Sequence, residues 1–119
     1  PEIEAVKNNL YALGLDFGTE SVRCLAVDVN SGEEKAVAVY EYPDGVITHQ
    51  LPKTSITLGA DWALQNPQNW LDGMIQVVRQ VLQEGELDSS SVVSLGVCFT
   101  SSTVLPTKED GTPLCFFSQ

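Results

Sequence analysis

The first part of the chain carries three apolar runs separated by short polar turns. These runs cover residues 11–17, 22–29 and 35–42. They are rich in β-branched and small apolar residues, which is typical of strands. Residues 30–32, Asn-Ser-Gly, form a turn of hairpin length between the second run and the third. Because three consecutive strands with such short links form an antiparallel meander, the pattern predicts one over residues 11–42.

Residues 46–65 follow a Pro-Asp-Gly turn and show no clear period. We expect an irregular connection here, with one short strand near Val46 to His49. His49 is the single histidine of the chain and lies among polar residues. It is therefore predicted to be a surface residue and not a base.

A helix is predicted to begin at Pro67. Asn66 is a favoured N-cap, and proline in the first helical position loses no hydrogen-bond donor that the helix needs. Gly85 fits the C-terminal end of the helix. The apolar residues between them fall on one wide face, for which we expect burial: Trp70, Leu71, Met74, Ile75, Val77, Val78, Val81 and Leu82. The opposite face carries Asp72, Gln76, Arg79 and Gln83.

A nearly continuous apolar run, Val92 to Phe99, follows the helix after three serines. Such a run is typical of a central strand that is buried on both faces. Residues 104–106 and 114–117 flank an Asp-Gly turn, which predicts a second hairpin. The element order β-β-β-α-β, with the helix bringing the fourth strand parallel to the first, predicts an α/β fold with a mixed sheet.

Length and composition narrow the class of protein. A chain of 119 residues is one domain or part of one. Its formal net charge of −10 disfavours nucleic acid and acidic membrane as partners. No apolar run approaches membrane-spanning length, and residues 1–10 are a polar leader without the pattern of a secretory signal. We therefore expect a cytoplasmic protein.

The three cysteines, Cys24, Cys98 and Cys115, are an odd number at unrelated spacings in apolar surroundings. This favours buried free thiols in a reducing compartment. Metal ligation is disfavoured, since no further Cys or His completes a cluster.

Candidate chemistry gathers in the turn between the first two strands. A glycine at such a bend lets backbone N–H groups approach an anion, and hydroxyls add donors. A carboxylate there can hold hydrated Mg2+. The residues concerned are Asp16, Gly18, Thr19, Ser21 and Arg23. Taken alone, the pattern favours an ordinary hairpin whose Asp and Thr only cap the turn.

A second candidate is the run of hydroxyl residues that follows the fourth strand. It comprises Thr100, Ser101, Ser102 and Thr103. Because α/β sheets commonly bind ligands at the carboxyl ends of their strands, these residues can line a pocket for a polyol. The alternative is a Ser/Thr-rich turn without a ligand.

Three blocks in this order resemble the FGGY family of carbohydrate kinases, and within it the ribulokinase branch. They are Leu13 to Arg23, Asp61 to Pro67 with Trp70, and Gly96 to Leu114. The resemblance spans residues 11–119. It implies the actin-like, ribonuclease-H-type ATPase fold, present here as the first part of the N-terminal kinase domain, an incomplete domain without the second lobe.

The resemblance also implies roles for particular residues. Gly18 and Thr19 would contact the γ-phosphate of ATP, Asp16 would bind Mg2+ through water, and Ser21 and Arg23 would support the loop. Thr100 to Thr103 would contact a pentulose such as ribulose. Trp62 and Gln65 would wall the sugar pocket, although Trp62 is also compatible with core packing. Trp70 belongs to the apolar helix face and is expected in the core.

The chain also departs from the family. It ends at Gln119, before the catalytic carboxylate and the lobe that holds adenosine, so we expect the isolated chain to be inactive. Leu64 stands where many relatives outside the ribulokinase branch carry glutamate, which weakens the transfer of their sugar contacts. The parent enzyme's state as a homodimer stays open. A stand-alone sugar- or nucleotide-binding module and another actin-like ATPase domain are the alternative functions.

Overall fold

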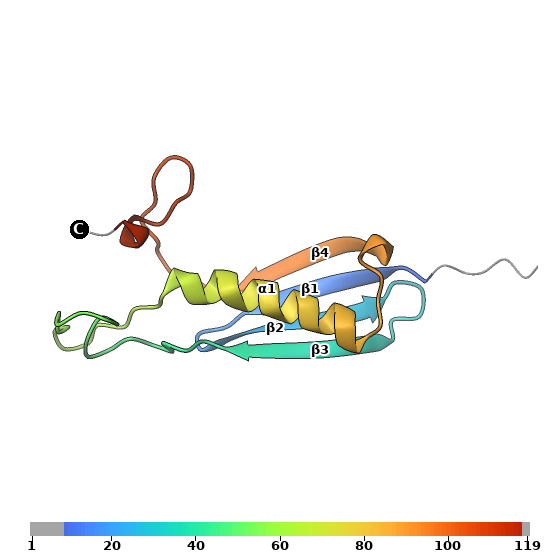
Figure 1. The fold of residues 1–119 in the computed structure, drawn as a ribbon, viewed down its shortest axis with the longest axis horizontal. Coiled ribbons are helices and arrows are strands. Elements are labelled where there is room, and N and C mark those ends of the chain that lie inside the picture. The colour runs from blue at the N-terminus through green and yellow to red at the C-terminus, as the bar shows by residue number, and fades with distance from the viewer. Residues whose placement is uncertain (1–8, 118–119) are drawn as a thin grey trace, which may run out of the picture.

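The computed structural model describes residues 9–117, so most of the predicted polar leader, residues 1–8, lies outside the described residues. Four strands, one long helix and two short 3-10 helices make up the fold (Figure 1). In chain order they are β1 (Tyr11–Phe17), β2 (Ser21–Asp28), β3 (Glu34–Glu41), α1 (Pro67–Glu84), η1 (Ser89–Ser91), β4 (Val92–Phe99) and η2 (Leu114–Phe116). The predicted element order is confirmed, with strand ends within one residue of those expected.

The four strands form one mixed sheet in the order β3-β2-β1-β4. β1 pairs with β2, and β2 with β3, in antiparallel fashion, while β4 runs parallel to β1 on its other side. The predicted meander and the predicted parallel crossover are both confirmed. The turn between β2 and β3 is held by Asp28, whose carboxylate accepts the backbone N–H groups of Asn30 and Ser31 at 2.8 and 3.0 Å.

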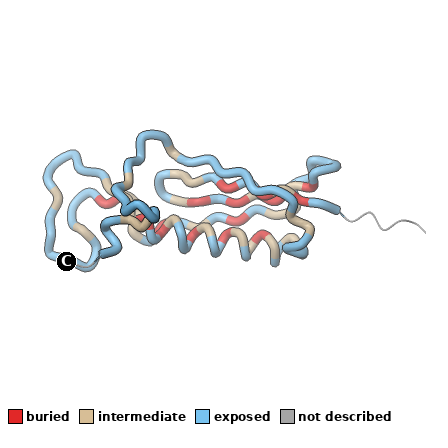
Figure 2. The backbone as a smooth tube through the Cα atoms, turned by 90° about the horizontal axis from the view of Figure 1, so that it is seen from above, coloured by how far each residue is buried: buried red, intermediate tan, exposed pale blue. Residues whose placement is uncertain are grey.

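Helix α1 covers one face of the sheet (Figures 1 and 2). It packs against β2 and β3, and its fully buried Val77 and Val81 enter the core. Alternate residues of each strand point to this face because the side-chain period of a strand is two. The buried core consists of Leu13, Leu15, Val22, Cys24, Ala26, Ala38, Tyr42, Val77 and Val81.

Two expectations about burial are wrong. β4 is not buried on both faces: Leu95, Val97 and Phe99 are 50, 52 and 71% exposed. On the helix, Leu71 and Ile75 are 45 and 47% exposed. The cause is the position of α1, which lies over β2 and β3, so that no described element covers β4 or the flank of α1 that faces it. The apolar sequence pattern indicated which residues can be buried, but burial also requires another element that packs against them.

Both ends of α1 are capped. The Asn66 side chain accepts the backbone N–H of Gln68 at 3.0 Å, as an N-cap does. Gly85 is the C-cap, as predicted, but its φ is −78° and the left-handed residue is Glu86, with φ 52°. The N–H groups of Glu86 and Leu87 donate to the carbonyls of Gln83 and Leu82, which is the pattern of a Schellman motif.

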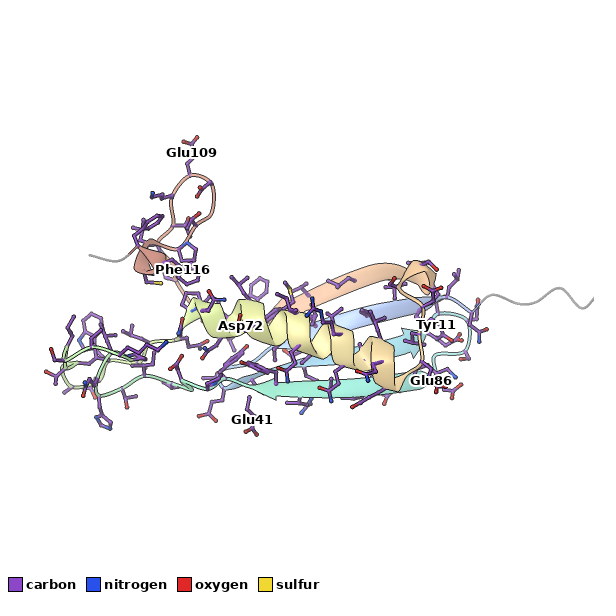
Figure 3. All side chains as sticks on the ribbon, in the orientation of Figure 1. Tyr11, Glu41, Asp72, Glu86, Glu109 and Phe116 are labelled. Carbon is purple, nitrogen blue, oxygen red and sulfur yellow. The ribbon has the colours of Figure 1, made fainter. Side chains whose placement is uncertain are left out.

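Two irregular segments extend from the end of the sheet at which β1 and β4 terminate (Figure 1). The predicted strand near residues 46–49 is reduced to a single bridge between Ile47 and Leu64. The predicted second hairpin is a loop closed by one bridge between Thr107 and Pro113, and η2 takes the place of its second strand. Figure 3 shows Glu109 at the tip of this loop, away from the sheet.

The cysteines differ from expectation in part. All three are free, and Cys24 is buried, which raises the pKa of its thiol. Cys98 and Cys115 are exposed, because β4 and η2 are uncovered. None of the helices in residues 9–117 has both the length and the apolar character required to cross a membrane.

Candidate functional site

The two candidate loops lie side by side at one end of the sheet. Since β1 and β4 are parallel, the turn after β1 and the hydroxyl-rich loop after β4 leave the sheet at the same edge. The pairing ends with Phe17 opposite Phe99, and it is extended by a hydrogen bond of 3.1 Å from the Thr100 N–H to the Phe17 carbonyl. Phe17 and Phe99, 82 positions apart in the chain, are thereby held next to one another.

The turn after β1 is closed tightly around Gly18. The Gly18 N–H donates to the Ser21 carbonyl at 2.8 Å. A Cβ on Gly18 would lie 3.2 Å from that carbonyl oxygen, which is a tight contact, so the close approach favours glycine here. The Gly18 N–H is therefore already occupied by the turn. Thr19 is exposed at the tip, and among the described residues nothing is found to accept from its N–H or its hydroxyl.

Asp16 and Arg23 lie on the face of the sheet that α1 leaves uncovered. They are direct register partners on β1 and β2, and both are exposed. Ser21, two residues before Arg23, is on the same face. Within residues 9–117 the one ion pair is Lys35 with Glu33, so Asp16 and Arg23 are both available to a ligand.

A groove of about 400 Å3 lies on the other face, between α1 and the end of β4. We call it groove A. Its polar members are Gly18, Gln65 and the loop Thr100–Ser101–Ser102–Thr103. Its apolar members are Phe17, Trp70, Leu71, Met74, Val97, Phe99 and Leu105. A few polar groups on an apolar wall are the usual make-up of a small-molecule site.

The hydroxyl-rich loop has its own internal geometry. The Thr100 and Thr103 hydroxyl oxygens lie 3.2 Å apart, within hydrogen-bond distance of each other. Ser102 between them has a left-handed backbone, with φ 65°. Such a conformation is uncommon for a residue with a side chain and clusters at functional sites. The spacing of the hydroxyls in sequence gave no sign of it.

Gln65 lies between groove A and a second groove of about 530 Å3, and it lines both. Its side-chain oxygen accepts a hydrogen bond of 2.9 Å from the indole Nε1 of Trp70, which also lines both grooves. Trp70 was expected in the core; it is half-buried and packs against the core with its other side, so the expectation holds only in part. Trp62 is 57% exposed and lines neither groove, so the structure does not bring it to Gln65.

The structure thus brings together part of the predicted set. Gly18, Gln65 and Thr100–Thr103 share groove A. Asp16, Ser21 and Arg23 lie on the opposite face of the sheet, and Thr19 lies at the tip of the turn that joins β1 to β2. The sequence reading missed that Phe17, Met74 and Phe99 line the same groove. The available signal was that Phe17 and Phe99 end apolar strands and Met74 lies on the apolar face of the helix, but it does not distinguish a groove wall from a core.

The donor set is compatible with a phosphorylated ligand and a hydrated divalent cation. Thr19 offers an N–H and a hydroxyl, and Asp16 offers one free carboxylate. Residues 9–117 contain no group of three or more His, Cys, Asp or Glu that could enclose a metal by themselves. A cation such as Mg2+, which keeps several waters, would therefore be held by Asp16, water and the ligand's own oxygens.

Residues 11–116 match the family described as the N-terminal domain of the FGGY family of carbohydrate kinases. The chain is 42% identical over 109 residues to a ribulokinase of Halalkalibacterium halodurans, covering 92% of this chain and 19% of the relative. It is 41% identical over 105 residues to a ribulokinase of Geobacillus thermodenitrificans, covering 88% of this chain and 18% of that protein. The chain therefore spans about a fifth of the length of the curated relatives it matches.

Solved structures confirm the fold. A xyloylose kinase from Brucella ovis superposes with a TM-score of 0.70 at 19% identity, over 87% of this chain and 19% of that one. A gluconate kinase from Lactobacillus acidophilus superposes with a TM-score of 0.67 at 17% identity, over 89% of this chain and 18% of that one. The mixed sheet with its crossover helix is thus the start of the actin-like ATPase fold of these sugar kinases.

Proposed function

Because the chain belongs to the FGGY family of carbohydrate kinases, we propose that it is the N-terminal part of an ATP-dependent kinase for a pentulose such as ribulose. The observation that carries the proposal is the position of Gly18. It belongs both to the turn after β1 and to groove A, where Thr100–Thr103 gather. A phosphoryl group held at the turn would lie at the rim of a groove suited to a sugar.

The turn supplies the phosphate side of the proposed site. Phosphoryl transfer depends on positioning and on neutralising charge more than on covalent help from the protein. Thr19 would donate its free N–H and hydroxyl to the γ-phosphate. Asp16 would hold Mg2+ through water, and the bound ion would neutralise phosphate charge. Ser21 and Arg23 would support the loop from the uncovered face.

Groove A supplies the sugar side. Its hydroxyl-rich loop offers both donors and acceptors to the hydroxyls of a pentulose, and Phe17, Met74 and Phe99 give apolar surface for the sugar's C–H groups. Gln65 adds an amide. Trp62, which lines neither groove, stays a prediction for the sugar pocket.

The family assignment also bears on activity. We assign residues 11–119 to the first part of the kinase domain, in the cytoplasm, with ATP and the sugar as its ligands. Transfer requires a base near the attacking hydroxyl and closure of two lobes. Groove A holds hydroxyl, amide and apolar groups but no carboxylate or histidine. The isolated chain should therefore bind its ligands without turning over.

Binding of Mg-ATP to the isolated chain, measured by titration calorimetry, tests the phosphate side. Asp16→Asn is expected to weaken Mg-ATP about tenfold, because the negative charge that holds the hydrated ion through water is lost. Thr19→Ala removes one hydroxyl donor and should weaken it about fivefold. Asp72→Asn, an equal charge change on the exposed face of α1, is the control. Equal affinities for Asp16→Asn and Asp72→Asn would overturn the assignment of Asp16.

Turnover by the isolated chain is a separate test. Pure material incubated with ATP, Mg2+ and ribulose should release no more ADP than the same mixture without the sugar. Sustained ribulose-dependent ADP release would show that the described residues suffice for catalysis and would overturn the proposal that they do not.

A further inference from the structure

The hydrogen bond between Trp70 and Gln65 has a fixed direction. An indole N–H is a donor only, so the atom that faces it across 2.9 Å must be the amide oxygen of Gln65. A flipped amide would set its NH2 group against the indole N–H, which places donor against donor. The amide nitrogen, Nε2, is therefore the free end of the side chain.

Gln65 differs in this respect from three other glutamines. The Nε2 atoms of Gln68 and Gln80 donate to Asp72 and Glu84 at 2.8 Å, and that of Gln50 donates to the Thr54 carbonyl. In each case the NH2 group is already bound within its own segment. Among residues 9–117 no acceptor is found for Nε2 of Gln65, although the side chain is half-buried on the wall of groove A.

The backbone on both sides of this pair is held by the start of α1 and by a hydrogen bond to the preceding loop. Gln65 immediately precedes the N-cap Asn66, and Trp70 lies on the first turns of α1. Asn66 is tied in turn to the loop before it, by a hydrogen bond of 2.8 Å to the Asp44 carboxylate. An uncommitted donor held in place beside apolar side chains is effective, because a hydrogen bond is stronger where the surroundings are less polar.

From this geometry we propose that Trp70 is a positioning residue, which orients the Gln65 amide so that its NH2 group binds an acceptor oxygen of the ligand in groove A. The inference rests on the proposed function, under which that oxygen is a carbonyl or hydroxyl oxygen of the pentulose. Trp70 itself need not touch the sugar. Its role is to exclude the amide orientation that would present an oxygen to the groove.

Nuclear magnetic resonance on the 15N-labelled chain reports separately on the Gln65 amide, the Trp70 indole and the hydroxyl-rich loop. Ribulose is added up to high millimolar concentration, and three sets of signals are followed: the Gln65 side-chain NH2, the Trp70 indole N–H, and the backbone N–H groups of Thr100–Thr103. We expect the Gln65 NH2 and the loop signals to shift together along one binding curve. The indole N–H should exchange slowly with solvent with or without ribulose.

Two variants separate orientation from packing. Trp70→Phe keeps an aromatic ring and removes the donor, so that the amide can flip; ribulose should bind about fivefold more weakly. Gln65→Glu keeps an oxygen for the indole but presents a second oxygen to the groove, and should weaken ribulose at least tenfold while the indole N–H stays protected. Gln76→Glu, the same change at an exposed position of α1, is the control and should bind as the unmodified chain does.

The possible results separate the positioning role of Trp70 from the sugar site itself. If the loop signals shift with ribulose but the Gln65 NH2 does not, or if Trp70→Phe binds ribulose as tightly as the unmodified chain, the positioning role is wrong while the sugar site stands. If neither set shifts, the sugar site itself is wrong and the inference falls with it. An indole N–H that exchanges freely in the ligand-free chain also overturns the inference, independently of any ligand.

Discussion

A Cβ atom on Gly73 would lie 2.6 Å from Cδ1 of Tyr40, so α1 rests directly on the Tyr40 ring of β3. The same atom would lie 2.7 Å from Cγ1 of Val22 on β2. A glycine in the middle of a helix costs about 1 kcal/mol relative to alanine. Here it permits the close approach of helix and sheet on which the core depends.

Gly73→Ala is therefore expected to destabilise the fold. The gain in helix propensity of about 1 kcal/mol is outweighed by overpacking of two side chains, which typically costs about 1–3 kcal/mol per site. We expect a net loss of about 1–2 kcal/mol in urea unfolding. Gly96→Ala, where an added Cβ meets no atom within 4 Å, is the matched control and should be nearly neutral. Higher stability of Gly73→Ala would show that α1 can move away from Tyr40 at little cost.

Glu86→Gly is expected to stabilise the chain. Glu86 holds a left-handed conformation at the C-terminal end of α1, with φ 52°, where glycine is strongly preferred. Removing the Cβ relieves a strain of about 1–2 kcal/mol but adds flexibility to the unfolded chain, so the net gain should be about 0.5–1 kcal/mol. Thermal unfolding of the two proteins measures it. Gln83→Gly, inside the helix, should lower stability instead.

Two of the three thiols should react in the folded protein. Cys98 and Cys115 are exposed, whereas Cys24 is buried and its pKa is raised, which lowers the fraction of reactive thiolate. Brief iodoacetamide treatment followed by mass spectrometry should find two modified cysteines at pH 8, and three in urea. Rapid labelling of Cys24 in the folded chain would contradict the packing of the core between α1 and the sheet.

Stability should fall on the acid side of about pH 4. Backbone hydrogen bonds from Ser31 and Asn30 lower the pKa of Asp28, and similar bonds at Ser90 and Thr112 lower those of Asp88 and Asp110. A carboxylate whose pKa is lower when folded stabilises the fold above the unfolded value, about 3.9, and loses that effect as the pH falls through the folded value.

Asp28→Asn checks the share of one residue. The amide oxygen can still accept both N–H groups but does not titrate, so the melting temperature should be somewhat lower at pH 7 and fall less steeply between pH 4 and pH 2.5. Asp72→Asn, for which no such backbone hydrogen bonds are found, serves as the control. An acid-side slope in Asp28→Asn equal to that of the unmodified chain would count against the role of Asp28.

Much of the fold follows from local pattern. The Asn66–Pro67 start of α1 and the limits of β4 are confirmed because caps and apolar runs act over a few residues. The burial of β4, Leu71 and Ile75 was predicted wrongly, since burial depends on which element covers a surface. The exposure of Cys98 and Cys115 has the same cause.

In the candidate site, too, some features follow from the sequence and others depend on the three-dimensional packing. The sequence located Gly18 and the Thr100–Thr103 loop, and the parallel pairing that joins them follows from the crossover. The Gln65–Trp70 hydrogen bond and the close contact of Gly73 could not be read from the sequence, because each depends on how a side chain or a helix is oriented in three dimensions.

β1 pairs with β4 without interruption from Ala12 to Phe17, so the lengths of the two strands determine how the loops that follow them are placed relative to each other. One residue inserted into either strand would shift its following loop by about 3.3 Å and turn every later side chain to the other face. Such an insertion would separate Gly18 from Thr100 without changing either. The loop around residues 107–113 carries no such constraint, so variation in chain length during evolution should collect there and spare the two strands.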